Sequence, residues 1–244
     1  MKTLIRITIL ISIYLALLFT TSSCNFDGVI GVKGNRNVVS EDREIRSDFE
    51  IITVQQGINL FITQGKPTNI NVEADENIMD LLITEVKSNE LNIYFEKNVN
   101  QAKARNVYLT TETILKIKAS SGASVNSENT LQSASLELDS SSGSTIKIRV
   151  NANDVISESS SGSSIKLYGK CNTFTANSSS GSTINARELK TVDAKVQASS
   201  GANINVNVTG KLMAKASSGA DIDYNGSPEA IDKETSSGGS VSGN

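Results

Sequence analysis

The sequence of 244 residues contains no histidine and no tryptophan. Without histidine, a Ser-His-Asp or Cys-His catalytic site cannot form, and zinc loses one of its usual ligands. Aromatic residues make up only 5% of the chain, which argues against a platform of rings that stacks sugars or bases. The residue types therefore predict no catalytic site, no metal site and no cofactor.

An excess of positive charge is also missing. The chain carries 23 Lys and Arg against 26 Asp and Glu, a formal net charge of −3, and its basic residues are scattered. A nucleic-acid-binding domain needs a basic patch or stripe, so no nucleic-acid partner is predicted. The acidic residues are dispersed as well. Two pairs that each flank one hydrophobic residue of a strand, Glu137 with Asp139 and Asp221 with Asp223, are explained by a solvated strand face.

Cysteine is scarce: the chain has two, Cys24 and Cys171. Residues 1–23 have a positively charged start and an apolar stretch, which predicts a signal peptide. Small residues precede Cys24, as in a bacterial lipoprotein signal, so Cys24 is the predicted lipidation site and the mature N-terminus. Acyl chains on it would anchor the protein to a membrane, whereas ordinary signal-peptide cleavage nearby is the alternative. Cys171 is then a lone thiol in a loop or half-buried position.

What the sequence does contain is a repeat. Ser-Ser-Gly occurs seven times with a period near 19 residues, and its glycines are Gly122, Gly143, Gly162, Gly181, Gly201, Gly219 and Gly238. Three residues after each glycine stands a β-branched aliphatic residue: Val125, Ile146, Ile165, Ile184, Ile204, Ile222 and Val241. Seven residues before it stand Leu115, Leu136, Val155, Phe174, Ala194, Leu212 and Ile231. Such a period is typical of a solenoid, and inward positions two residues apart are typical of strands.

The repeat predicts an all-β fold, a single-stranded parallel β-helix with about 19 residues per coil over residues 113–244. Successive coils would stack about 4.8 Å apart and align the branched aliphatic residues into a core. Ser-Ser-Gly would form the corner, where glycine adopts a positive φ at little cost.

The second serines of the repeats form a candidate binding ladder: Ser121, Ser142, Ser161, Ser180, Ser200 and Ser218. The structural interpretation is favoured, because short hydroxyl side chains bond to the backbone in turns. The alternative is a flat strip of hydroxyls that contacts sugars or ordered water.

The N-terminal half is also β-rich but irregular. Residues 24–33 are predicted to be a tether, and residues 34–112 to be either looser coils continuous with the repeats, which we favour, or a cap over the end of the solenoid. A hairpin is expected over residues 85–95, and a short helical turn after Asp75.

Within this half, Gly57-Ile58-Asn59 follows a strand that begins near Phe49, and another strand covers residues 91–95. Together with the Ser-Ser-Gly coils, these features resemble the family of putative auto-transporter adhesins with a head GIN domain, over roughly residues 30–242. The resemblance implies a right-handed β-helix exported to the cell envelope, and it is the source of the idea of adhesion.

The predicted function is that of a non-catalytic, lipid-anchored envelope protein, at the outer membrane, that binds a glycan or an envelope protein along the solenoid face. Two alternatives stay open. One is a polysaccharide lyase or hydrolase on a β-helix, which needs carboxylates about 5–9 Å apart. The other is a structural envelope component with protein partners only. The oligomeric state is left open.

Overall fold

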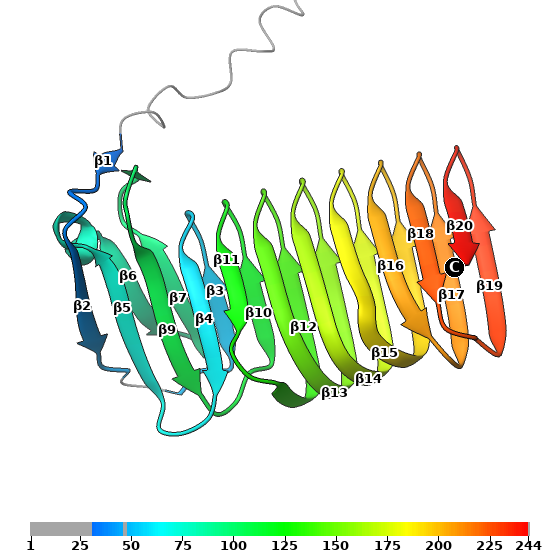
Figure 1. Ribbon diagram of the computed structural model, residues 1–244, viewed down its shortest axis with the longest axis horizontal. Helices are drawn as coiled ribbons and strands as arrows, with labels where there is room; N and C mark the ends of the chain where they lie inside the picture. Colours follow the sequence, from blue (N-terminus) through cyan, green and yellow to red (C-terminus); the bar gives the residue numbers. More distant parts are fainter. Residues whose placement is uncertain (1–30, 46–47, 244) are drawn as a thin grey trace, which may run out of the picture.

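The computed structural model describes residues 31–45 and 48–243, and within them it is a β-solenoid. Its coils stand side by side along the long axis, with their tight turns aligned along one edge (Figure 1). The predicted all-β solenoid is therefore confirmed. The predicted signal peptide, residues 1–23, and Cys24 lie outside the described residues. Within the described ranges, no helix has the length and apolar character needed to cross a membrane.

A typical coil shows how the sequence pattern produces the core. Strand β13 (Thr145–Ser159) runs down one side of the solenoid, bends near its middle and returns up the other side. Its alternate residues, among them Ile146, Ile148 and Val155, are buried. β13 pairs in parallel with β14 (Ser164–Ser178), which places Ile146 against Ile165 and Val155 against Phe174. Two parallel sheets thus face each other across one apolar core.

The sheet nearer the viewer in Figure 1 is called the front sheet, and the one behind it the back sheet. The front sheet contains, in spatial order, β2 (Val38–Arg43), β5 (Asn69–Asp75), β9 (Arg105–Thr111), β4 (Asn59–Gln64), β11 (Ser124–Ser127), the first parts of β13, β14 and β15 (Thr183–Ala198), β16 (Asn203–Val208), β18 (Asp221–Asn225) and β20 (Ser240–Gly243). The back sheet contains β6 (Leu82–Lys87), β7 (Glu90–Phe95), β3 (Ile51–Val54), β10 (Lys116–Ala119), β12 (Leu131–Ser140), the second parts of β13, β14 and β15, β17 (Lys211–Ala216) and β19 (Ala230–Thr235). A separate pair joins β1 (Val32–Lys33) to β8 (Val99–Asn100).

The aliphatic column three residues after each glycine lies in the core, as predicted. Its first six members are at most 1% exposed, and Val241 in the last coil is partly buried. In the column seven residues before each glycine, only the middle members, from Leu136 to Leu212, are buried in the core. Leu115 and Ile231, at its two ends, are 42% and 43% exposed, so the prediction was wrong for them. Ile114 fills the core in place of Leu115, and no coil of the described chain follows Ile231.

The Ser-Ser-Gly corners are type I′ turns. In Ser179-Ser180-Gly181 both central residues have positive φ, 54° and 69°, and the Ser182 amide donates to the Ser179 carbonyl at 3.2 Å. The Gly181 amide in turn donates to the Ser200 carbonyl of the next coil at 3.1 Å. Gln56-Gly57 has similar positive φ values, 59° and 67°, and joins the same column, because the Gly57 amide donates to the Ser121 carbonyl.

Inside each turn, two small residues four apart face each other. In the coil of Ser159 and Ser163 the two hydroxyl oxygens are 2.8 Å apart, and the single hydroxyl hydrogen of Ser163 is shared between the Ser140 and Ser160 carbonyl oxygens, at 2.7 and 2.8 Å from Oγ. Three coils carry such serine pairs, and three others carry alanine at both places: Ala119 with Ala123, Ala198 with Ala202, and Ala216 with Ala220. A buried hydroxyl needs a partner, which explains why serine accompanies serine.

The N-terminal half is wound out of sequence order. The β3–β4 coil lies between the later strands β7 and β9 on one side and β10 and β11 on the other. Antiparallel pairs β2–β5, β5–β9 and β6–β7 then cover the end of the solenoid. This half thus combines coils with a cap, where the sequence favoured looser coils alone. The β6–β7 pair confirms the predicted hairpin.

Asp75 organises the cap. Its carboxylate is fully buried and accepts hydrogen bonds from the backbone amides of Arg36, Lys103 and Ala104 at 2.8–3.0 Å. Burial raises the pKa of this carboxyl, but the hydrogen bonds outweigh burial, so its pKa lies below the ordinary value. The predicted helical turn follows as the 3₁₀ helix η2 (Glu76–Leu81), although Asp75 makes no side-chain cap to it.

A candidate binding groove beneath the turns

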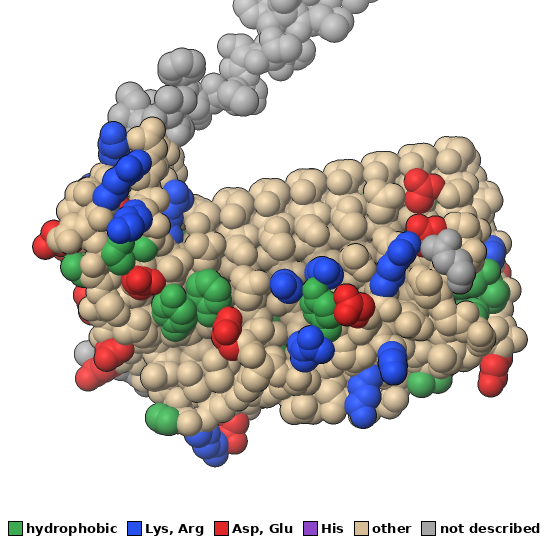
Figure 2. Space-filling model, in the orientation of Figure 1, with side chains coloured by type: hydrophobic (Ala, Val, Ile, Leu, Met, Phe, Trp, Pro, Cys, Tyr) green, Lys and Arg blue, Asp and Glu red, His purple; other side chains and the backbone are tan. Residues whose placement is uncertain are grey.

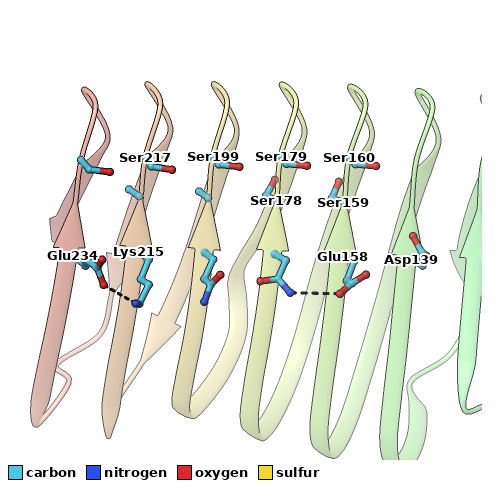
Figure 3. A pocket seen from close by; sticks show the side chains of 15 residues that line it. Asp139, Glu158, Ser159, Ser160, Ser178, Ser179, Ser199, Lys215, Ser217 and Glu234 are labelled. Atoms are coloured by element: carbon cyan, nitrogen blue, oxygen red, sulfur yellow. Dashed lines mark hydrogen bonds and ion pairs between the residues drawn. The ribbon is translucent and has the colours of Figure 1, made fainter.

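A groove of about 610 Å³ runs along the solenoid axis on the back sheet, directly beneath the turns (Figure 3). Six consecutive coils contribute to it. Its lining residues are Asp139, Glu158, Ser159, Ser160, Asn177, Ser178, Ser179, Gln197, Ala198, Ser199, Lys215, Ala216, Ser217, Glu234 and Ser236. Because each coil repeats the previous one, the groove repeats the same two kinds of position along its length.

The wall nearest the turns consists of the first serine of each Ser-Ser-Gly. Ser160, Ser179, Ser199 and Ser217 are half-buried, and their hydroxyls point in the same direction in Figure 3. Each serine immediately precedes a turn whose backbone is bonded to the next coil, so the turn column fixes its position. The result is a row of hydroxyls about 4.8 Å apart.

The opposite wall consists of longer polar side chains, one from each coil: Asp139, Glu158, Asn177, Gln197, Lys215 and Glu234. Asn177 Nδ2 donates to Glu158 Oε1 at 3.4 Å, and Lys215 Nζ forms an ion pair with Glu234 Oε2 at 2.6 Å (Figure 3). The hydrogen bond and charge of Glu234 raise the pKa of Lys215, which keeps it protonated. The two amides thus stand at the centre of the groove, with charged residues on either side.

The predicted ladder of second serines, Ser121, Ser142, Ser161, Ser180, Ser200 and Ser218, does form a column, but it lies outside this groove. These residues occupy the exposed tips of the turns with φ between 52° and 54°. Type I′ turns prefer Asn, Asp or Gly at this position, so the turn geometry alone does not explain serine. A binding role for these hydroxyls stays a prediction.

The sequence interpretation missed the groove, which uses the first serine of each repeat and the residue four before each glycine. Aligning the repeats on their glycines does show a polar residue at that second position in every coil, from Lys118 to Glu234. That signal was available. The sequence alone could not show that the first serines and the residues four before each glycine border one groove.

The acidic pairs singled out in the sequence have structural partners. Glu137 forms an ion pair with Lys116, whose pKa it raises. Asp221 and Asp223 accept hydrogen bonds from Ser240 and Ser242 of the next coil at 2.5 and 2.6 Å. Within the described ranges, no three His, Cys, Asp or Glu side chains are grouped so that they could hold a metal ion.

Cys171 is a buried strand residue of β14, so its predicted placement in a loop or half-buried position was wrong. Its sulfur lies 3.4 Å from Thr191 Oγ1. Burial raises the pKa of the thiol, which suppresses the reactive thiolate. Cys171 does not line the groove, whose side chains are mainly hydroxyls, amides and carboxylates. These groups hold a ligand by hydrogen bonds.

The sequence profile of the family described as "Putative auto-transporter adhesin, head GIN domain" matches residues 48–228. A comparison with curated proteins gives no match. Among solved structures, a putative adhesin from Bacteroides fragilis is 21% identical with a TM-score of 0.82, and the match covers 88% of this chain and all of that one.

Two further crystal structures share the fold. A putative lipid binding protein from Parabacteroides distasonis is 19% identical with a TM-score of 0.70, over 87% of this chain and 99% of its own. A putative adhesin from Parabacteroides merdae is 18% identical with a TM-score of 0.68, over 87% and 98%. At these identities the likeness concerns the fold alone.

Proposed function

Because this chain belongs to the putative auto-transporter adhesin, head GIN domain family, we propose that it is a non-catalytic envelope protein that binds an extended glycan along the groove of its back sheet. Adhesion is a property named for the family and for several structural neighbours, and the groove is where this chain could carry it out.

The observation that carries the proposal is the periodicity of the groove. Every coil adds one hydroxyl and one longer polar side chain at a spacing of about 4.8 Å. A linear polymer of similar sugar units presents hydroxyl groups at regular intervals, so several units can make the same contacts in turn. A compact ligand would use only part of such a surface.

The charges of the groove favour a neutral polymer over an acidic one. Asp139, Glu158 and Glu234 contribute three negative charges and Lys215 one positive charge. A polyanion would be repelled by this balance, while hydroxyl groups can donate to the carboxylates and to the amide oxygens of Asn177 and Gln197.

Attachment to the membrane forms a second part of the proposal. Cys24, outside the described residues, would carry the acyl chains and hold the protein at the outer membrane. The described chain enters the solenoid at its capped end (Figure 1), so the repeat coils would extend away from the point of attachment.

A glycan array tests the binding. We expect the protein to bind arrays of neutral linear polysaccharides, and the variant with Asn177→Leu and Gln197→Leu to bind about tenfold or more weakly, since it loses two amides. Asn203→Leu is the matched control, because Asn203 is an exposed amide of β16 on the front sheet. Equal binding by the groove variant would contradict the proposal.

The same incubations distinguish binding from catalysis. A binding protein returns the polysaccharide at its original length, whereas a lyase or hydrolase releases unsaturated products or reducing ends. Release of either would favour the enzyme. Binding of an envelope protein, with no bound saccharide, would favour a structural component.

A further inference from the structure

A second hollow lies on the front sheet, on the opposite face from the groove. It has a volume of about 480 Å³ and is lined by Phe61, Asn126, Ser127, Glu128, Lys147, Ile148, Arg149 and Tyr168. Figure 2 shows the setting: hydrophobic side chains gather on part of this face, and beside them Lys and Arg side chains surround another hydrophobic one. We call this hollow the front slot.

One wall of the front slot is aromatic. Phe61 and Tyr108 stack with ring centroids 5.0 Å apart and planes inclined by 15°, as neighbours on the paired strands β4 and β9. Tyr108 is 41% exposed, and its hydroxyl lies 3.3 Å from a Glu73 carboxylate oxygen. Phe61 lines the slot and Tyr108 does not, so Tyr108 covers one face of Phe61 and the other face borders the slot.

The floor between the walls is made by Asn126. It is paired with Phe61 on one side and with Lys147 on the other, so one coil separates the ring from the first cation. The neighbouring Ser127 is engaged, because its Oγ accepts a hydrogen bond from the Arg149 amide at 2.9 Å. The Asn126 side chain is shorter than those of Phe61 and Lys147 on either side of it. It therefore leaves a gap between Phe61 and Lys147 that is two coil spacings wide, about 10 Å.

The other wall is cationic: Lys147, Arg149 and Tyr168 line it, and Lys166 stands beside it, paired with Lys147. Lys166 Nζ, Arg149 Cζ and Lys147 Nζ lie 5.1, 5.2 and 6.0 Å from the ring centroid of Tyr168. Three positive groups around one ring repel each other, and none of them forms an ion pair with a carboxylate elsewhere in the described chain. An anion placed among them would relieve that repulsion.

We propose that the front slot binds an acidic sugar residue, of the uronic or sialic acid class. The apolar face of the pyranose ring packs against the free face of Phe61, by the dispersion and ring-quadrupole interactions that aromatic side chains make. Its carboxylate lies against Lys147 and Arg149, with Lys166 beside them across the Tyr168 ring, and Asn126 contacts its hydroxyls. This site uses none of the groove residues and does not depend on the glycan proposed there.

Two carboxylates set the limit on the charge of the ligand. Glu128 lines the slot, and Glu188 is paired with Tyr168 on the adjacent strand. Their two negative charges offset two of the three positive charges of Lys147, Arg149 and Lys166. A ligand with about one negative charge would balance the third. A nucleic acid or a heavily sulfated chain carries more, and the slot holds too few apolar side chains for an acyl chain.

Calorimetric titration with oligogalacturonic acid, using neutral galactose oligosaccharides of equal length for comparison, tests the assignment. The titration uses the groove variant with Asn177→Leu and Gln197→Leu, which weakens binding of neutral glycans in the groove. In this variant we expect the acidic oligosaccharide to bind and the neutral one to bind at least tenfold more weakly. Lys147→Gln with Arg149→Gln, the two cations that line the slot, should weaken acidic binding about tenfold or more, which corresponds to about 1.4 kcal/mol. Phe61→Leu should weaken it too, with an unchanged melting temperature showing that the fold is intact.

Lys170→Gln is the matched control, because Lys170 is an exposed lysine of the same strand outside the slot. The groove variant with Asn177→Leu and Gln197→Leu should bind the acidic oligosaccharide normally, so failure of one site does not imply failure of the other. The proposal is overturned if both oligosaccharides bind the groove variant equally, or if the slot variants bind like Lys170→Gln. It is also overturned if those variants lose binding to duplex DNA or to anionic phospholipid vesicles while the acidic oligosaccharide never binds.

Discussion

A single residue type, serine, has three different environments within one coil of this solenoid. Ser161 is exposed at the tip of a turn in a left-handed conformation. Ser163 is buried and bonded to Ser159 and to two carbonyls. Ser157 is also buried, but its Oγ has no hydrogen-bond partner among the described residues. The energetic effect of each hydroxyl therefore depends on its partners and not on its burial.

The two buried serines predict opposite effects of the same substitution. Ser157→Ala should raise the free energy of unfolding by about 1 kcal/mol, because it removes an unsatisfied hydroxyl from a column that has Leu138 and Ala176 on either side. Ser163→Ala should lower it by about 1–3 kcal/mol, because Ser159 and two backbone groups lose a partner. Urea denaturation followed by circular dichroism measures both. Changes of the same sign would contradict this account.

The turn and the bend are the elements that close each coil, and they use glycine for different reasons. Gly181 in the turn has φ 69°, and a Cβ added there would meet open space, with no heavy atom within 4 Å. Gly169 at the bend of β14 has φ 110°, and a Cβ there would lie 2.0 Å from the Val150 carbonyl oxygen of the preceding coil. The turn requires a backbone conformation, whereas the bend also requires the absence of a side chain.

Substitutions at these two glycines should therefore differ in severity. Gly181→Ala should lower the free energy of unfolding by about 1–2 kcal/mol, the cost of a left-handed conformation, and Gly181→Val should cost more because its side chain is β-branched. Gly169→Ala should be more damaging than Gly181→Ala, since adjacent coils must separate. Thermal melting of the three variants compares them, and an unchanged melting temperature for Gly181→Val would argue against the corner assignment.

At the scale of the whole molecule, the two ends of the solenoid differ. Antiparallel strands and η2 cover the N-terminal end, whereas β19 in the last coil is exposed along its whole length. The described chain begins at the covered end (Figure 1), so the lipid attachment proposed above would hold the molecule at that end. The long faces, where the groove and the front slot lie, stay accessible in that arrangement.

Attachment through the N-terminus predicts the behaviour of one variant. Cys24→Ala should move the protein from the membrane pellet to the soluble fraction, because the proposed acyl chains on Cys24 would supply about 0.8 kcal/mol per buried methylene. Fractionation of cells followed by immunoblotting checks this. If the variant stays with the membrane, the anchor lies elsewhere in the chain, while the fold and both binding sites would be unaffected.

Much of the architecture follows from the sequence because a repeat forces neighbouring coils to be alike. The period near 19 residues, the inward column that includes Ile146 and Ile165, and the turn at each glycine are local patterns that repetition makes unambiguous. The family could be identified from the same residues and from Gly57-Ile58-Asn59.

The tertiary structure decided what repetition does not encode. The antiparallel cap and the out-of-order β3–β4 coil depend on long-range pairing, which the irregular sequence of that half does not specify. Both candidate sites also arise from pairing: Phe61 meets Tyr108 and faces Lys147 only because strands 47 to 86 residues apart in sequence become neighbours in one sheet. Because aromatic residues are few, the sequence predicted no aromatic binding surface. In the folded solenoid, Phe61, Tyr108 and Tyr168 lie on the front sheet.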